Sequence, residues 1–301
     1  MKPPVHVIMN PFFDCATPSL DTVSTFMQAL EAVRRRLPRE AWHDFARTDA
    51  TVRRWRFFLA ADPYTRWGLL KPRGYPGDAT LMDFAYGHAS VRDSIAAAGT
   101  AGGRIYDHTS MARQSQSARH RIALLGARLR ALSADGSRAC VASFASGHAR
   151  ELECLSAGER AAIEHFTAID LDAASLDTAR GCAEGMEFTP VRRNVIADGF
   201  DDLPQVDFAY SLGLFDYLND ARARAVLTKM WQRVAPGGTL LVANLAPDAG
   251  NLAYCEAIMD WWMIPRSALQ MAQLGQGIGE GSTRTRTVTQ QGCFHYLEIS
   301  H

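Results

Sequence analysis

One stretch decides the fold of this chain: Ala139-Cys140-Val141-Ala142-Ser143-Phe144, then Ala145-Ser146-Gly147-His148-Ala149, then Arg150-Glu151-Leu152. A short apolar run, a turn of small residues and the start of a helix follow one another, as at the beginning of a βαβ unit. Such a turn lets backbone N–H groups approach a polar or anionic ligand, although an ordinary strand-to-helix turn looks the same. Only one glycine of a three-glycine dinucleotide fingerprint is present, which disfavours pyrophosphate binding.

Working outward, short apolar runs alternate with stretches of helical period, which predicts a mostly parallel sheet. The helical stretches are Arg150–Leu155, Ser175–Ala183 and Ala221–Val234, the last ended by Pro236-Gly237-Gly238. Gln291-Gly292 separates the last two runs as a hairpin signal. The seven expected strands are Ala139–Phe144, Phe166–Asp170, Glu187–Val191, Val206–Ser211, Thr239–Asn244, Thr283–Gln290 and Cys293–Ile299.

The N-terminal part has a different pattern of apolar residues, with helical periodicity throughout. From Pro18 to Leu132 apolar residues recur at helical spacing, with no strand signal, and Ser115–Leu132 is its last predicted helix. The turn around Gly136 then predicts a boundary near residue 135. We expect a helical lid over residues 1–135 and a Rossmann-like α/β domain over residues 136–301.

Composition excludes several classes of protein. The 301 residues carry 32 basic and 32 acidic side chains, so no net charge draws the chain to nucleic acid or anionic membranes. Only three basic residues are lysines, a bias more typical of a GC-rich genome than of a polyanion site. Six cysteines without metal-ligand spacing, no signal segment and no long apolar run predict a cytoplasmic protein without a metal site or membrane insertion.

The strand ends carry the candidate site. Asp170 ends the second run, where its carboxylate can accept hydrogen bonds from ribose hydroxyls, whereas Asp172 fits a helix cap better. After the third run, Asn194 and Val195 can hold an adenine edge, and after the fourth, residues 211–213 can line the ribose and sulfur side of a ligand. Because the carboxyl ends of parallel strands share one edge, these residues form one predicted site.

Residues 138–301 resemble class I S-adenosylmethionine-dependent methyltransferases through ASFASGHAREL, AIDLD, YSLGLFDYL and APGGTLLVAN. The chain is most similar to a bacterial subgroup with a helical extension carrying KPRGYPGD, here Lys71–Asp78, and a DWWMIPR-like insertion, here Asp260–Arg266. That subgroup is similar to enzymes that make methyl esters of hydroxy fatty acid signals. The resemblance implies an α/β fold with a seven-stranded sheet, and S-adenosyl-L-methionine as cofactor.

The resemblance also implies roles for residues at matching positions. Near His148 and Ala149 the chain lacks the family's usual second glycine, which puts the details of carboxylate binding in doubt. The implied cofactor-binding residues are Ala145, Ser146 and Gly147 for the methionine moiety, Asp170 and Leu171 for the ribose end, Asn194 and Val195 for the adenine, and Ser211, Leu212 and Gly213 near the sulfonium.

Aromatic and polar residues supply the predicted catalytic set of Tyr75, Asp78 and Tyr217. Tyr75 and Asp78 lie in a turn-forming sequence that we expect to close over the cofactor, with Asp78 as a helix cap in the alternative. For Arg113, Arg119 and Arg121, a solvated helix face is favoured over carboxylate binding. The other aromatic candidates for the sulfonium, each with core packing as an equal alternative, are Phe144, Phe215 and Trp261.

The resemblance implies methyl transfer, and the expected substrate is a small organic acid or secondary metabolite. The lack of an evident general base is compatible with an acid acceptor, since a carboxylate needs none, and equally compatible with the cyclisation below. His148 is a weak candidate base. One alternative is a cyclase that converts the cofactor into azetidine-2-carboxylic acid and methylthioadenosine, with Tyr75, Asp78 or Asn244 holding the amine. A second is a noncatalytic cofactor-binding scaffold. We expect Trp261 and its neighbours either to wall an acceptor pocket or to form the face of a homodimer.

Overall fold

The computed structural model describes residues 19–132, 138–283 and 285–301. They divide into two compact units. A helical unit contains residues 19–116 and Ala249–Trp262, and a sheet unit contains Ser117–Asp248 and Met263–His301, apart from the undescribed positions. Across the described residues, none of the helices combines the length and apolar content that crossing a bilayer requires.

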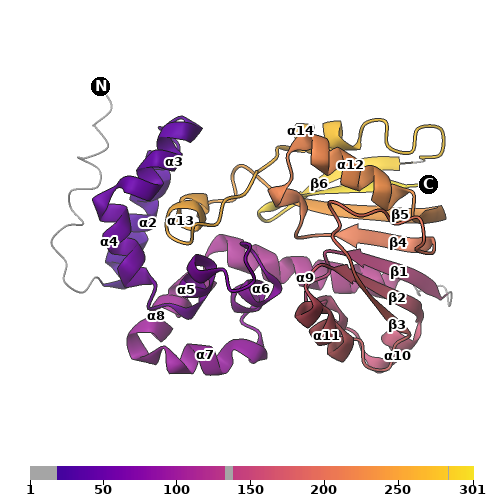
Figure 1. Ribbon diagram of the computed structural model, residues 1–301, viewed down its shortest axis with the longest axis horizontal. Coiled ribbons are helices and arrows are strands. Elements are labelled where there is room, and N and C mark those ends of the chain that lie inside the picture. The colour runs from indigo at the N-terminus through magenta and orange to yellow at the C-terminus, as the bar shows by residue number, and fades with distance from the viewer. Residues whose placement is uncertain (1–18, 133–137, 284) are drawn as a thin grey trace. The chain divides into compact units, whose positions relative to one another are not determined.

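The sheet unit is built on one seven-stranded sheet in the order β3-β2-β1-β4-β5-β7-β6 (Figure 1). β7 runs antiparallel to both of its neighbours, β5 and β6, and every other pair is parallel, which confirms the predicted Rossmann-like architecture. The strands are β1 Ala139–Phe144, β2 Ile163–Asp170, β3 Phe188–Arg192, β4 Val206–Ser211, β5 Val234–Leu245, β6 Thr285–Gln291 and β7 Phe294–Ser300.

Helices border the sheet: α11 contacts β2 and β3, α12 contacts β5, and α14 contacts β6 and β7 (Figure 1). The apolar faces of α12 and α14 meet the sheet in one core of fully buried side chains, including Phe144, Val226 and Leu240. The helices of this unit are α9 Arg113–Ala131, which begins four residues before the unit boundary, the 3-10 turns η3 Arg150–Cys154 and η4 Phe215–Tyr217, α10 Ala157–Ala161, α11 Ala173–Cys182, α12 Asp220–Trp231 and α14 Ala268–Gly275.

The region around Pro236-Gly237-Gly238 differs from the prediction. α12 ends at Trp231, and β5 already begins at Val234, so these residues interrupt a strand and do not end a helix. The pairing of β4 with β5 shifts register here, from Val206 opposite Val234 to Phe208 opposite Thr239. A side chain on Gly238 would meet the Asp207 carbonyl oxygen at 2.8 Å, so this bulge requires glycine.

The helical unit contains no strand among its described residues, as predicted. Side chains cap several of its helices: Asp49, Asp62 and Asp78 each accept hydrogen bonds from first-turn amides of α4, α5 and α6. Its helices are α2 Leu20–Arg34, α3 Arg39–Thr48, α4 Ala50–Leu59, α5 Pro63–Leu70, α6 Ala79–Tyr86, η2 Ala89–Val91, α7 Arg92–Ala97, α8 Gly99–Ser110 and α13 Leu252–Ala257.

A segment distant in sequence completes this unit. Every residue of α13 is buried, and α13 packs on α2 and α3. Glu256 accepts hydrogen bonds from Arg34 Nε at 2.6 Å and from Trp42 Nε1 at 2.7 Å, and the Tyr254 hydroxyl lies 2.6 Å from Thr65 Oγ1. The division therefore differs from the boundary predicted near residue 135: it falls after Gln116, and residues 249–262 join the helical unit.

Candidate functional site

The candidate site lies at the carboxyl ends of β1 to β4, where open α/β sheets bind ligands. β1 and β4 are neighbours in the sheet although β2 and β3 come between them in sequence, so the strand order reverses here. The loop after β1 has left-handed backbone at alternate residues, with φ of 54° at Ala145, 54° at Gly147 and 49° at Ala149. Two of these are alanines, in a conformation that costs an L-residue about 1 kcal/mol each.

Asp170 ends β2 and is buried. Its two carboxylate oxygens accept separate backbone hydrogen bonds, from Gly147 N at 2.8 Å and from Asp172 N at 2.9 Å. Burial raises the pKa of Asp170, although these backbone donors pull it down. The first loop and the acid predicted to bind the ribose are thus joined by a direct hydrogen bond.

Asp172 serves a different purpose. Its Oδ2 accepts hydrogen bonds from the backbone N of Ser175 at 3.1 Å and from the Ser175 hydroxyl at 2.6 Å. The residue is the N-cap of α11, which confirms the cap interpretation. Two acids two residues apart therefore have separate roles at the same strand end.

The loop after β3 is a turn organised by Asn194. Its side-chain oxygen accepts hydrogen bonds from Ile196 N at 3.0 Å and Ala197 N at 3.2 Å, so that oxygen is used within the loop. Val195 is buried. Two large apolar side chains are exposed at these neighbouring strand ends, Leu171 at 50% and Ile196 at 39%. The sequence interpretation did not include Ile196, although its position directly after Asn194-Val195 was a signal that it belongs to the same loop.

The loop after β4 contains an unsatisfied hydroxyl. Ser211 is 0% exposed and its Oγ has no hydrogen-bond partner, and the Oγ of Ser146, in the loop after β1, is likewise buried and unpaired. Buried polar groups without a partner are rare, and hydroxyls of this kind can pair with the polar atoms of a ligand. Leu212 is buried, whereas a side chain added at Gly213 would meet open space. Tyr217 is half-buried in η4.

A cluster of buried charges that the sequence interpretation missed lies at the same ends of β1 and β4. Arg121 on α9 donates to the Leu212 carbonyl and its guanidinium lies 4.5 Å from the centroid of the Phe294 ring. The prediction that Arg121 lies on a solvated helix face is wrong, because α9 directs this buried side chain toward the sheet. Arg113 is exposed, as expected, and Arg119 is half-buried.

Two buried acids surround this arginine. Glu151 accepts a hydrogen bond from the Tyr210 hydroxyl at 2.5 Å, and Asp216 accepts one from Leu245 N at 2.6 Å. Burial raises the pKa of both acids, that of Asp216 to about 6, while Arg121 lowers them. Arg266 is a second buried arginine near Asp216 and lowers the pKa of that carboxyl as well.

Tyr75 and Asp78 belong to the helical unit. Asp78 is the buried N-cap of α6: its Oδ1 accepts from Leu81 N at 2.7 Å, and both its oxygens accept from Trp67 Nε1. The structure therefore confirms the cap alternative for Asp78. Tyr75 is half-buried in the preceding turn. Phe144, Phe215 and Trp261 are buried, and the first two belong to the hydrophobic core.

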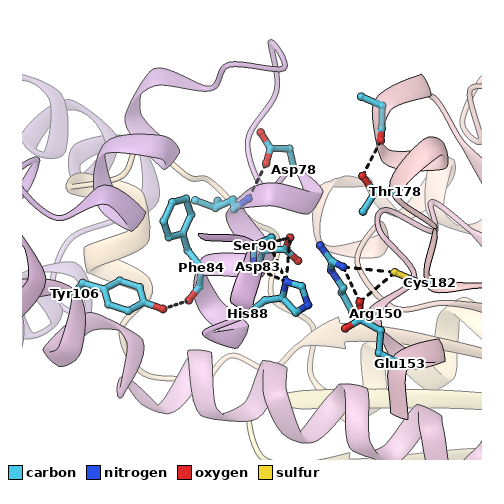
Figure 2. A network of polar contacts seen from close by, with 12 residues as sticks. Asp78, Asp83, Phe84, His88, Ser90, Tyr106, Arg150, Glu153, Thr178 and Cys182 are labelled. Atoms are coloured by element: carbon cyan, nitrogen blue, oxygen red, sulfur yellow. Dashed lines mark hydrogen bonds and ion pairs between the residues drawn. The ribbon is translucent and has the colours of Figure 1, made fainter. Parts of the chain in front are cut away.

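Two side-chain clusters resemble nucleophilic sites but lack their geometry (Figure 2). Ser90 Oγ lies 2.8 Å from His88 Nδ1, but its hydroxyl proton is donated to Asp83 at 2.8 Å, and His88 Nδ1 accepts from Ser90 N at 3.1 Å. A catalytic serine must donate to the histidine, so this cluster braces a turn. In the sheet unit, Cys182 donates to Glu153 at 3.3 Å, and burial raises its thiol pKa to about 12, which leaves it unreactive.

The chain matches no protein-family model and no curated protein, but its fold matches solved structures. A "possible exported protein" from Bordetella parapertussis is 20% identical, with a TM-score of 0.52, over 65% of this chain and 72% of that one. At that identity the likeness shows the fold alone. Magnesium protoporphyrin IX methyltransferase from Synechocystis PCC 6803 is 13% identical (TM-score 0.46; 62% of this chain, 84% of that one). The N-methyltransferase NodS from Bradyrhizobium japonicum WM9 is 14% identical (TM-score 0.45; 62% and 87%).

Proposed function

We propose that the chain is an enzyme that binds S-adenosyl-L-methionine at the carboxyl edge of its sheet and transfers the methyl group to a small organic acid. The observation that carries this proposal is Asp170. It is a buried carboxylate at the end of β2, held by the N–H of Gly147 from the glycine-containing loop. An acid in this position of an open α/β fold binds the hydroxyls of a nucleoside ribose.

Residues around Asp170 fit the rest of the cofactor. Leu171 and Ile196 offer exposed apolar surface for a flat adenine ring at the ends of β2 and β3. The unpaired hydroxyls of Ser146 and Ser211 are suited to receive polar atoms of the methionine end. Ala145, Gly147, Leu212 and Gly213 complete this set as backbone contacts, with Asn194 and Val195 on the adenine side.

The charges favour the same cofactor. Asp170, Glu151 and Asp216 are three buried acids, with two buried arginines near them: Arg121 beside Glu151 and Asp216, and Arg266 beside Asp216. A bound sulfonium would add a positive charge to this carboxyl-rich region, and Tyr217 is the aromatic candidate beside it. Bound S-adenosylmethionine supplies an electrophilic methyl group, and the residues described here orient it and exclude water.

We propose a carboxylic acid as the acceptor because its methylation requires no general base. A carboxylate attacks in its ordinary ionised form, and His148, the candidate base beside the first loop, is buried. The cyclase alternative loses one of its amine-binding candidates. Asn244 is fully buried, its Nδ2 donates to the carbonyls of Leu245 and Ile264, and its Oδ1 accepts from Arg266. Tyr75 stays a predicted contact of the cofactor.

One experiment tests the proposal. The purified chain is incubated with S-adenosylmethionine, alone and with a panel of hydroxy fatty acids and small carboxylic acids, and the nucleoside product is identified by mass. S-adenosylhomocysteine that forms only with an acid supports the proposal. Methylthioadenosine formed without an acceptor would replace it with cyclisation, and binding of the cofactor without turnover of any kind would replace it with a scaffold.

A further inference from the structure

Lys229, on the α12 helix, holds the loop after β3. Its ammonium group donates three hydrogen bonds to backbone carbonyls of that loop: Val195 O at 3.2 Å, Ile196 O at 3.1 Å and Asp198 O at 2.6 Å. Its Nζ also lies 5.1 Å from the centroid of the Phe200 ring. An ammonium group has three N–H bonds, so all of its donors are directed to this one loop.

Only three of the 32 basic residues in the chain are lysines, and Lys229 is one of them. An ammonium group carries its three N–H donors on one tetrahedral nitrogen, so it can bond to three carbonyls that surround a single point. A guanidinium spreads its donors over three nitrogens in a plane. In this loop a single nitrogen atom, Lys229 Nζ, contacts all three carbonyl oxygens, which is the arrangement that an ammonium group can satisfy.

Arg266 holds the loop after β4 in a comparable way. It is 1% exposed, and its five N–H groups all have partners: Asp220 Oδ1 twice, Phe215 O at 2.9 Å, Leu218 O, and Asn244 Oδ1 at 2.6 Å. The same loop is fixed by Ile264 N, which donates to Asp216 O at 2.7 Å. The carboxyl-terminal half of the Asp260–Arg266 insertion therefore braces the loop that contains Tyr217.

We propose that Lys229 and Arg266 are positioning residues, each of which fixes one ligand-binding loop from behind: Lys229 the adenine-side loop and Arg266 the loop beside the sulfonium. The inference rests on the proposed function for the identity of the ligand. Neither side chain needs to touch the ligand, because each acts through the backbone carbonyls that it holds.

The roles proposed for Lys229 and Arg266 predict different losses of affinity for adenosine and S-adenosylhomocysteine. Calorimetry is carried out with adenosine and with S-adenosylhomocysteine on Lys229→Met, Lys229→Arg, Arg266→Met and the control Arg224→Met. Arg224, also on α12, donates to two backbone carbonyls, Gln273 O and Gln276 O, away from both loops. Lys229→Met is expected to lower the affinity for both ligands about 10-fold, and Lys229→Arg is expected to show a similar loss. Arg266→Met is expected to weaken S-adenosylhomocysteine about 10-fold and adenosine less than about 2-fold.

Hydrogen exchange separates failure of this inference from failure of the proposed function. Amides of residues 195–198 are expected to exchange faster in Lys229→Met, and those of residues 215–218 faster in Arg266→Met, with no change in Arg224→Met. If the native chain binds neither nucleoside, the proposed function fails, but exchange still decides whether the two side chains hold the loops. Unchanged exchange in both variants, or equal losses for both ligands in Arg266→Met, would overturn the inference.

Should Arg266→Met not fold, Asp220→Ala provides the same test. The Asp220 side chain is 77% exposed and accepts two of the five hydrogen bonds of Arg266, so its loss leaves the core intact. The expected result is a smaller change in the same direction: faster exchange at residues 215–218 and an affinity for S-adenosylhomocysteine lowered about 3-fold, with adenosine unchanged. If Asp220→Ala showed native exchange rates at residues 215–218 and native affinity for S-adenosylhomocysteine, the role proposed for Arg266 would be overturned.

Discussion

Replacing Asp170 with alanine tests the site most directly. The proposed ribose contact consists of two hydrogen bonds from hydroxyls to an ionised carboxylate, and each such bond contributes about 1.5 kcal/mol or more. Their loss amounts to about 3 kcal/mol, or a roughly 100-fold weaker affinity for S-adenosylhomocysteine. The variant also leaves the N–H groups of Gly147 and Asp172 without their acceptor, at a cost of about 2 kcal/mol in unfolding free energy.

The control is Asp172→Ala at the same strand end. Asp172 caps α11 and accepts from Ser175, so its loss costs about 1 kcal/mol of stability without removing a ligand contact. Calorimetric titration with S-adenosylhomocysteine, well below the melting temperature of both variants, measures the affinities. The reasoning would be refuted if Asp170→Ala bound as tightly as the native chain, or if both variants lost affinity equally.

Three further predictions concern buried side chains. Burial raises the pKa of Asp216 to about 6 from an ordinary value of 3.8, so its contribution to stability is greatest below pH 4 and is lost as the pH rises through 6. Urea titrations should show that Asp216→Asn removes up to about 3 kcal/mol of this pH dependence, and an unchanged profile would contradict the assigned pKa. Glu256→Ala should cost about 3 to 5 kcal/mol, because it leaves Arg34 and the indole of Trp42 without their buried acceptor; thermal melts that match the native chain would exclude this. Native Cys182 should resist iodoacetamide at pH 7 and react after denaturation, as mass spectrometry of the labelled peptides would show.

The sheet was largely predictable from the sequence. β1 and β4 match their predicted bounds, since buried parallel strands appear as short apolar runs ended by small or polar residues. The start of β5 was wrong, because Pro236-Gly237-Gly238 has the same composition whether it ends a helix or forms a bulge. Local sequence does not record which strand lies opposite, and that pairing decides between the two.

Other features depend on contacts between residues far apart in the chain. The burial of Arg121 follows from its contacts with Leu212 and Phe294, 91 and 173 positions away. An arginine on a helix surface normally faces water, so composition and spacing favour the wrong interpretation. The joining of residues 249–262 to the helical unit was likewise hidden, since a short apolar helix looks the same whichever core it fills.

The late position of α13 has a consequence for biosynthesis. The N-terminal helices emerge from the ribosome well before Tyr254 and Glu256, which complete their core, have been translated. At ordinary elongation rates this interval is on the order of 10 s, during which apolar surface on α2 and α3 lacks its natural cover. Nascent chains that stall between residues 120 and 245 should therefore depend on chaperones, and truncated products of that length should be cleared rapidly by cellular proteases.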